Sequence, residues 1–354
     1  MRLEKIRDIL NEWYFDNKRV LPWRETSDPY RIWISEIILQ QTRVNQGLDY
    51  YNRFVNRFPD IKSLASASED EVLTYWQGLG YYSRARNLHK ASQKITEIYA
   101  GEFPENYDDI VKLPGIGSYT ASAICSFAYH QNYAVLDGNV FRVLSRLFNI
   151  STPIDTGAGK KEFTKLAEIF LNKEDSYTHN QAIMEFGALQ CTPLNPRCDI
   201  CSLSNFCNAY RQNCVMDLPI KKGKIAVSYR YFNYFYIQNG DYFYLQKRNN
   251  KDIWQNLYEF PLIETTENLP LPDLVNTVEF KRLMIDMKDI EFVQPDFTTK
   301  HILSHRIILA SFYCIKISEE NNTLKSLIKI KLSDIENYAI PRLIEVFLEK
   351  RILI

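Results

Sequence analysis

The sequence has no excess of charge of either sign, since its 354 residues include 43 Lys and Arg and 43 Asp and Glu. A protein that binds nucleic acid through bulk charge carries surplus Lys and Arg, so this class is excluded. Any contact with a polyanion must therefore be local. Hydrophobic residues make up 45% of the chain and charged residues 24%, which excludes a mostly disordered protein. The length predicts about two domains.

Long apolar runs are also missing. The longest stretch without Asp, Glu, Lys or Arg covers residues 113–136, but Pro114, Gly115, Gly117 and the polar residues 130–132 interrupt it. We therefore expect no membrane span. The first 17 residues mix charges with apolar residues at helical spacing, which is not the pattern of a signal peptide. Together these absences predict a cytoplasmic protein.

Alternating strand patterns are scarce before about residue 210, and no internal repeat is evident. Apolar residues there recur at spacings of three and four, which predicts helices at 31–45, 59–76, 84–99, 118–129, 138–148 and 160–171. A basic linker at 214–228 follows, and the period then changes to two. We expect strands at 229–238 and 241–248 around Asn239-Gly240, further strands at 301–317 and 326–331, and a closing helix from Pro341. The predicted domains are 1–213, all helical, and 229–354, α+β.

Cysteine is sparse except in one segment, which holds four of the seven. The four form the pattern C-x6-C-x2-C-x5-C at Cys191, Cys198, Cys201 and Cys207. Four thiolates within this span can converge on one metal centre. Zinc sites usually combine two closely spaced pairs, so the single x2 pair favours an iron–sulfur cluster. Four unrelated thiols are the alternative.

A glycine turn lies inside the charge-free stretch, where Gly115 and Gly117 precede an expected helix. Backbone N–H groups and the positive end of that helix would suit a phosphate, although a plain helix connection has the same pattern. Asp137 begins the next expected helix, and an acid there is either a helix cap or a catalytic group.

Glu36 stands among apolar residues in Trp-Ile-Ser-Glu-Ile-Ile-Leu. A buried glutamic acid has a raised pKa and can donate a proton near neutral pH. A solvated glutamate on the open face of the helix is the alternative. The uncharged residues Gln40, Gln41 and Thr42 follow and would suit base edges or backbone.

These motifs together resemble the helix–hairpin–helix DNA glycosylases with an iron–sulfur loop, and within them the MutY-type, A/G-specific adenine DNA glycosylases. The resemblance covers nearly all of the first domain. It rests on LPWR, WISEIILQQTRV, WQGLGYYSRARNLHKA, LPGIGSYTA, VLDGNVFRVLSR, MEFGALQC and the cysteine spacing, which occur in the family's order at 21–24, 33–44, 76–91, 113–121, 135–146, 184–191 and 191–207.

The resemblance implies an enzyme that flips adenine out of double-stranded DNA where it is mispaired with 8-oxoguanine or guanine, and hydrolyses its glycosidic bond. Glu36 would protonate adenine, and Asp137 would stabilise an oxocarbenium-like sugar. Tyr119 and Asn139 would line the same site. The four cysteines would bind a [4Fe–4S] cluster. The protein would be a bacterial, cytoplasmic monomer, associated with the nucleoid when bound to DNA.

The resemblance also assigns contacts to the rest of the substrate. Around the adenine pocket it places Trp23, Arg24, Leu39 and Glu185. Near the extruded base it places Gln41 and Tyr81, and on the DNA backbone Gly115, Gly117 and Ser118. The neutral total charge further implies a narrow basic footprint from the linker and from Arg84, Arg86, Arg142 and Arg146.

The second domain resembles a Nudix-like domain, on the sequence from Lys247 to Pro261, but no REUXEE-type box follows. A pyrophosphatase that acts on the nucleotide pool is therefore not expected. By resemblance, the domain recognises 8-oxoguanine through Leu303, Ser304 and His305. The family usually has Phe where this chain has Leu303, which removes an aromatic face.

Two other classes remain as alternatives. An endonuclease III-like glycosylase and AP lyase, acting on oxidised pyrimidines, would carry a lysine in the hairpin helix, but this chain has Tyr119 there. Since a phenol cannot form an imine with the sugar, we predict a monofunctional glycosylase. A DNA-binding scaffold without enzymatic activity would not need Glu36 and Asp137 together.

Overall fold

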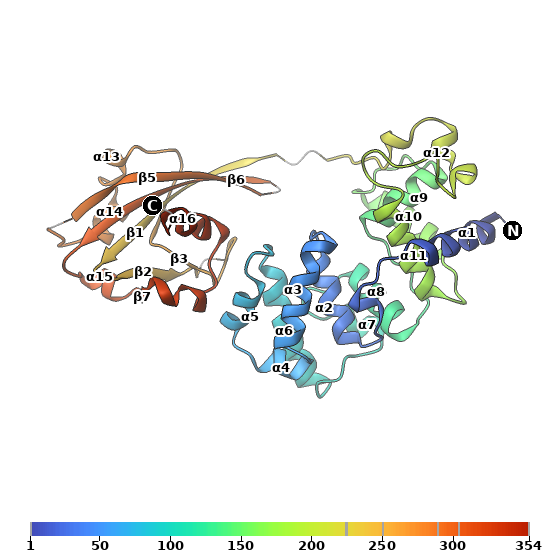
Figure 1. The fold of residues 1–354 in the computed structure, drawn as a ribbon, viewed down its shortest axis with the longest axis horizontal. Helices are drawn as coiled ribbons and strands as arrows, with labels where there is room; N and C mark the ends of the chain where they lie inside the picture. The colour runs from blue at the N-terminus through green and yellow to red at the C-terminus, as the bar shows by residue number, and fades with distance from the viewer. Residues whose placement is uncertain (1, 224–225, 250, 289, 304, 353–354) are drawn as a thin grey trace. The chain divides into compact units, whose positions relative to one another are not determined.

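The computed structural model describes residues 2–223, 226–249, 251–288, 290–303 and 305–352 (Figure 1). The chain forms two compact units. The first unit comprises residues 1–66 and 87–224, and the second comprises 67–86 and 225–354. In the part of the chain that the structure describes, no helix is both long and apolar enough to cross a bilayer. The domain boundaries expected from the sequence stay a prediction.

The described part of the first unit is helical, as expected. Its α-helices are α1 (Arg2–Asn17), α2 (Pro29–Leu39), α3 (Val44–Arg57), α4 (Ile61–Ser66), α7 (Tyr107–Ile110), α8 (Ser118–Tyr129), α9 (Gly138–Phe148), α10 (Gly157–Phe170), α11 (Ser176–Leu189) and α12 (Asn208–Arg211). Short 3-10 turns are η1 (Pro22–Arg24), η2 (Ser204–Phe206) and η3 (Val215–Asp217). The helix α6 (Ser83–Ile98) continues from the second unit into the first.

Two of the expected helices are interrupted. The segment 31–45 contains the end of α2 and the start of α3, because the chain turns between them and Gln41 takes a φ of 57°. The segment 59–76 is split into α4 and α5 (Glu69–Trp76), since Ser68 adopts an extended conformation and caps α5 by accepting a hydrogen bond from the Glu71 N–H at 3.2 Å. Apolar spacing alone carries no signal for such breaks.

The helices α2 and α8 of the first unit pack against each other. Trp33 and Ile34 on α2 are fully buried, and so are the small residues Ala121 and Ala123 on α8. Small side chains let two helix backbones approach closely. Since α8 starts at the glycine turn, this packing fixes the position of that turn beside α2.

The second unit is built on a seven-stranded sheet among the described residues. Its strands are β1 (Ser228–Asn239), β2 (Tyr242–Lys247), β3 (Tyr258–Glu259), β4 (Leu262–Thr265), β5 (Ile290–Ile302), β6 (Arg306–Ile317) and β7 (Ile328–Lys331). The main order is β3-β2-β1-β6-β5, with β4 paired to β1 and β7 to β2. Its short helical segments are α13 (Leu271–Leu274), α14 (Val278–Leu283), α15 (Asn322–Lys325) and η4 (Leu332–Asn337), and α16 (Arg342–Ile352) is longer.

The strand expected at 301–317 is two antiparallel strands. The end of β5 pairs with the start of β6, with Ile302 opposite Ile307, so the chain reverses between Ile302 and Arg306. The strand β6 also pairs in parallel with β1, from Ser228 beside Arg306 onwards. Leu303 and His305, on either side of this reversal, therefore lie at one end of the two central strands. Phe347 of α16 stacks on Phe312 of β6, with ring centroids 4.6 Å apart, and closes the core.

Candidate active site

Glu36 lies on α2 and is buried, with 7% of its surface exposed. The helix starts at Pro29, and Asp28 caps it by accepting a hydrogen bond from the Tyr30 N–H at 2.9 Å. Tyr119, on the first turn of α8, donates its phenolic O–H to Glu36 Oε2 at 2.7 Å. The alternative of a solvated glutamate is wrong, because α2 is covered on the face that carries Glu36.

The pKa of Glu36 is raised to about 7, mainly because burial disfavours the charged carboxylate. The hydrogen bond from Tyr119 acts in the opposite direction, since it stabilises the ionised form, whereas the nearby Asp137 raises the pKa further. A carboxylic acid with this pKa is partly protonated at neutral pH. It can therefore donate a proton under physiological conditions.

Asp137 is the N-cap of α9 and accepts hydrogen bonds from the Val140 N–H and from Asn139 Nδ2, both at 2.7 Å. Burial raises the pKa of Asp137, and these two donors lower it by stabilising the carboxylate. The cap expected from the sequence is present, and it fixes both carboxylate oxygens. The capping geometry does not exclude a chemical role, because the carboxylate also lines a cavity.

One cavity of about 610 Å³ brings the two acids together. Its volume is in the range of small-molecule sites in proteins. Besides Glu36 and Asp137, it is lined by these residues expected from the sequence: Trp23, Arg24, Leu39, Gln41, Gly117, Ser118, Tyr119, Asn139 and Glu185. Residues from α2, α8, α9 and α11 thus meet at one site.

Glu185 is fully enclosed and ion-paired with two arginines. Its Oε2 lies 2.5 Å from Arg19 Nη2 and 2.8 Å from Arg24 Nη2. Burial raises the pKa of Glu185, but the arginine hydrogen bonds outweigh it and hold the pKa at about 2. Arg24 Nε also donates to Gln181 Oε1 at 2.9 Å. The part of the cavity wall formed by Glu185 is therefore ionised and cross-linked by hydrogen bonds.

Arg142 links the Asp137 side of the cavity to the cysteine loop. Its Nη2 donates to Asn139 Oδ1 at 2.9 Å and to the Gly187 carbonyl at 2.7 Å, and its Nε donates to the Cys191 carbonyl at 2.7 Å. The expectation that Arg142 and Arg146 contact DNA phosphates is wrong. Both guanidinium groups are buried and bonded to internal oxygens.

The glycine turn before α8 has the geometry of a tight hairpin. Gly115 has a φ of 76°, and a Cβ there would lie 2.7 Å from Asn87 Cβ, so only glycine fits without displacement. Gly117 is the N-cap of α8, and Gly115, Gly117 and Ser118 are all exposed. Exposed N–H groups at a helix start suit a phosphate oxygen.

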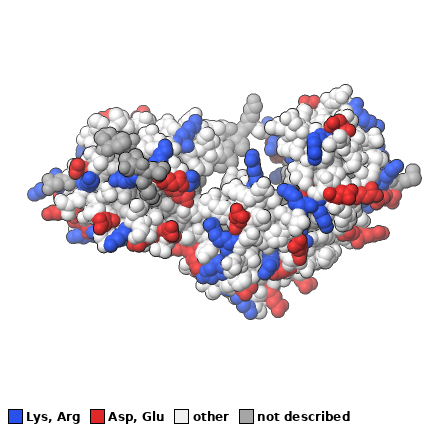
Figure 2. All heavy atoms as spheres, in the orientation of Figure 1, with Lys and Arg blue, Asp and Glu red and all other residues white. Residues whose placement is uncertain are grey.

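Figure 2 shows positive and negative side chains interspersed on the visible face of each unit, in agreement with the neutral composition.

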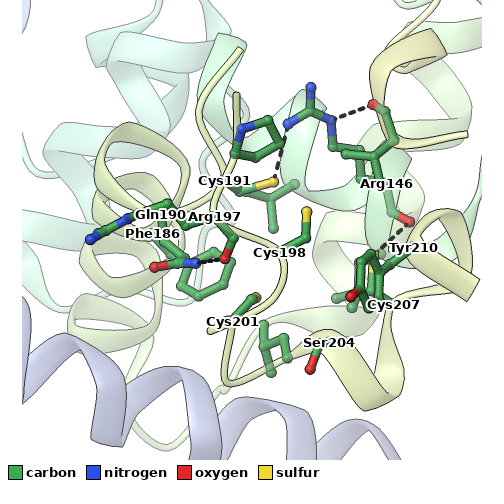
Figure 3. A pocket seen from close by; sticks show the side chains of 15 residues that line it. Arg146, Phe186, Gln190, Cys191, Arg197, Cys198, Cys201, Ser204, Cys207 and Tyr210 are labelled. Atoms are coloured by element: carbon green, nitrogen blue, oxygen red, sulfur yellow. Dashed lines mark hydrogen bonds between the residues drawn. The ribbon is translucent and has the colours of Figure 1, made fainter. Parts of the chain in front are cut away.

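The four cysteines of the predicted cluster motif line one cavity between α9, α11 and the loop 191–207. In Figure 3 the sulfurs of Cys191, Cys198 and Cys201 surround the same space, with Cys207 at its edge. Arg146 Nη1 lies 3.5 Å from Cys191 Sγ, which places a positive charge beside one of the four expected ligand sulfurs. Within the described ranges, no three His, Cys, Asp or Glu side chains are grouped for a single metal ion. Thiols spread around a cavity fit a multi-iron cluster.

The remaining predicted residues lie in the second unit. Tyr81 is 48% exposed and has a φ of 47°. Tyr81, Leu303 and His305 line a separate cavity of about 580 Å³, together with Trp254 and His301. Ser304 lies outside the described residues.

Comparison with known proteins agrees with these observations. Residues 34–169 match the model of the HhH-GPD superfamily base excision DNA repair proteins, and 191–207 match the iron-sulfur binding domain of endonuclease III. Residues 233–350 match the NUDIX domain. The fold and the site therefore define a helix–hairpin–helix DNA glycosylase with a [4Fe–4S] cluster and a Nudix-like domain, as the sequence predicts.

The relatives narrow this class. The chain is 33% identical over 345 residues to the adenine DNA glycosylase of Buchnera aphidicola subsp. Schizaphis graminum, covering 96% of both chains. It is 40% identical over 215 residues to the enzyme of that name from Mus musculus, covering 58% of this chain and 42% of the mouse protein. The chain belongs to the adenine DNA glycosylase family, and DNA is its substrate.

Solved structures share the fold of the first unit. A thermostable thymine-DNA glycosylase superposes with a TM-score of 0.56 at 27% identity, over 59% of this chain and 97% of that protein. Endonuclease III in a non-covalent DNA complex superposes with a TM-score of 0.52 at 23% identity, over 60% of this chain and 97% of its own. The second likeness concerns the fold alone.

Sequence reasoning missed two residues of the site. Arg19 pairs with Glu185 but stands outside the recognised motifs, and Thr120 is within hydrogen-bonding distance of Gln40 at 3.4 Å. Arg19 precedes the LPWR segment and shows no periodic pattern of its own. In the sequence, a cation next to the apolar residues Val20 and Leu21 does not indicate a role in the site.

Proposed function

We propose that this protein removes adenine mispaired with 8-oxoguanine or guanine in double-stranded DNA. The observation that carries the proposal is the pairing of Glu36 and Asp137 in one cavity, with the pKa of Glu36 at about 7. Adenine is a poor leaving group until it is protonated, and its departure leaves positive charge on the sugar. One acid that donates a proton and one carboxylate that stays ionised meet both requirements.

In this mechanism Glu36 delivers a proton to a ring nitrogen of the flipped adenine, and Tyr119 keeps the Glu36 carboxyl oriented through its 2.7 Å hydrogen bond. Asp137 then stabilises the oxocarbenium-like sugar while water attacks it, and the proton that the water releases returns to the ionised Glu36 carboxylate. The hydrogen bonds from Val140 and Asn139 hold the Asp137 carboxylate in place and favour its ionised form. Trp23 and Leu39 supply apolar walls, and Gln41 contacts the flipped base or its neighbours.

We further propose that the enzyme is monofunctional. Tyr119 occupies the hairpin-helix position where a Schiff-base lysine would stand, and its hydroxyl is engaged with Glu36. Lys112 is exposed and lies 3.5 Å from Asp109, on the other side of the turn. Borohydride should therefore fail to trap the enzyme on its DNA. Efficient covalent capture would contradict the proposal.

The proposal extends to cofactor and partners. Cys191, Cys198, Cys201 and Cys207 are the proposed ligands of the [4Fe–4S] cluster, which cross-links the loop. Gly115, Gly117 and Ser118 are proposed to bind a backbone phosphate. Tyr81, Leu303, Ser304 and His305 are proposed to recognise the base opposite adenine. We propose a monomer, associated with the nucleoid when bound to DNA.

The deciding experiment compares base release from duplexes that contain A:8-oxoguanine, A:G or thymine glycol, with and without alkaline cleavage of the product. We expect adenine release that needs alkali for strand scission, and no release of thymine glycol. Glu36→Gln should abolish turnover while the protein still binds the duplex. Release of thymine glycol with direct strand cleavage would favour the endonuclease III-like alternative.

A further inference from the structure

Among the described residues of the second unit, Asp252 is bonded to three arginines. Its Oδ2 lies 2.5 Å from Arg230 Nη1 and 3.0 Å from Arg248 Nη2, and its Oδ1 lies 3.0 Å from Arg306 Nη1. Each arginine comes from a different segment: Arg230 from β1, Arg248 from directly after β2 and Arg306 from the start of β6. One carboxylate thus joins three parts of the sheet through charge-assisted hydrogen bonds.

The third of these arginines ends the turn between β5 and β6. The Arg306 carbonyl accepts a hydrogen bond from the Leu303 N–H at 2.8 Å, and the His305 carbonyl accepts one from the Ser228 N–H at 3.1 Å. The backbone hydrogen bonds fix where the turn begins and ends. The ion pair between Asp252 and Arg306 adds a side-chain anchor directly after His305. Asp252, Leu303 and His305 also line the same cavity.

The segment that carries Asp252 is itself held firmly. Arg248 Nε donates to the Ile253 carbonyl at 3.0 Å, and Arg248 Nη1 lies 3.0 Å from the buried carboxylate of Glu259. Trp254 follows with a φ of 58°, and its ring contacts that of His301 at 5.5 Å between centroids. Asp252 therefore presents its carboxylate from a rigid base, and displacement of Arg306 would not be followed by displacement of Asp252.

We propose that Asp252 is a positioning residue for recognition of the base opposite adenine: it acts through Arg306 to hold Leu303 and His305 against that base. This inference rests on the proposed function. Without the carboxylate, Arg230, Arg248 and Arg306 would repel one another, and Arg306 is the most exposed and the freest to move, with 34% of its side chain exposed. Leu303 and His305 would then be held by backbone hydrogen bonds alone, without the side-chain anchor.

The test uses the full-length enzyme with its cluster and the variant Asp252→Asn. Glu264→Gln is the matched control, because Glu264 pairs with Arg230 at 2.6 Å in the same cluster, whereas among the described residues Arg306 is ion-paired with Asp252. For each protein, binding constants and single-turnover rates are measured on A:8-oxoguanine and A:G duplexes. Asp252→Asn should reduce the binding preference for 8-oxoguanine roughly three- to tenfold, since the lost ion pair is partly exposed. The control should keep the preference.

Measuring DNA binding and the single-turnover rate separately distinguishes a positioning role of Asp252 from a general loss of structure. The single-turnover rate on A:G at saturating enzyme should stay at the wild-type value in Asp252→Asn, because the acids of the first unit are untouched. Arg306→Gln should reproduce the lost preference, and Arg306→Lys should partly restore it by keeping a cation beside Asp252. The double variant Asp252→Asn, Arg306→Gln should lose no more than either single variant, as expected of two groups that act through one contact.

An unchanged preference in Asp252→Asn and Arg306→Gln would overturn the inference, and so would an equal loss in the Glu264→Gln control. These outcomes leave adenine excision by the wild type intact. A wild-type enzyme that excises adenine without any preference for 8-oxoguanine would instead overturn the recognition role of the turn, and with it this inference. Absence of adenine excision would overturn the proposed function itself.

Discussion

The hydrogen bond between Tyr119 and Glu36 sets the pH at which the enzyme loses its acid. Because a proton must come from Glu36, activity should fall as pH rises through its pKa of about 7. Tyr119 donates to Glu36 Oε2 at 2.7 Å and stabilises the ionised form, so it lowers this pKa. Tyr119→Phe removes the donor and should raise the pKa of Glu36.

The size of the shift follows from the bond that is lost. A hydrogen bond to a charged group contributes roughly 1.5–3 kcal/mol. Part of it is kept by the protonated form, and one pKa unit corresponds to about 1.4 kcal/mol. The alkaline limb of the rate profile should therefore move from near pH 7 to roughly pH 8, whatever the change in the maximal rate.

The assay is the single-turnover rate of adenine release on an A:8-oxoguanine duplex between pH 5.5 and 9.5. The matched control is Tyr129→Phe, because Tyr129 lies on the same helix but donates to the Phe103 carbonyl at 3.0 Å. The control should keep the wild-type limb. A limb that stays in place in Tyr119→Phe, or moves to lower pH, would refute the assignment of Glu36 as the acid.

Two further predictions concern stability and the second acid. Since the folded-state pKa of Glu36 lies above its ordinary value of 4.5, its contribution to stability is fully present below about pH 4 and is lost as pH rises through about 7. Glu36→Gln should therefore be more stable than the wild type at pH 8, by roughly 3 kcal/mol, and should lose this advantage near pH 4. Thermal melting of both proteins at pH 8 and pH 4 checks this prediction. An equal gain in stability at the two pH values would contradict it. Arg142→Gln should slow adenine release roughly tenfold or more with little change in DNA binding. The reason is that Asn139 loses its hydrogen-bond partner at 2.9 Å, so that Asp137 loses its orientation. An unchanged single-turnover rate would show that the hydrogen bond between Arg142 and Asn139 is dispensable.

Much of the helical fold could be predicted because its ends carry local signals. The helices at 118–129 and 138–148 begin and end where expected, since Gly117 and Asp137 cap them and His130 and Asn149 end them in the left-handed conformation. The fold class and the iron–sulfur cofactor are confirmed by the family matches. The cysteine spacing carried the second prediction without any need for tertiary structure.

Other features depend on contacts between distant segments. Apolar residues around Glu36 fit both a buried and a half-exposed helix, and only the packing of α8 against α2 decides between them. Arg142 and Arg146 look like surface cations because their carbonyl partners lie more than forty residues away, such as Cys191 and Thr192. The turn between β5 and β6 was missed because the residues at the reversal, Ser304, His305 and Arg306, include no glycine, proline or asparagine that would mark a turn.

The exposed hairpin at Gly115–Ser118 has a consequence for how the protein behaves in a cell whose water content changes. Attraction through lysine and arginine weakens steeply as salt rises, because each displaced phosphate counterion adds to the slope. Backbone N–H groups at a helix start can bind a phosphate without adding a full charge to the protein. With the phosphate contact proposed for this hairpin, the protein is expected to keep more of its affinity for DNA under osmotic stress than a protein that binds through many cations, and to leave undamaged stretches quickly.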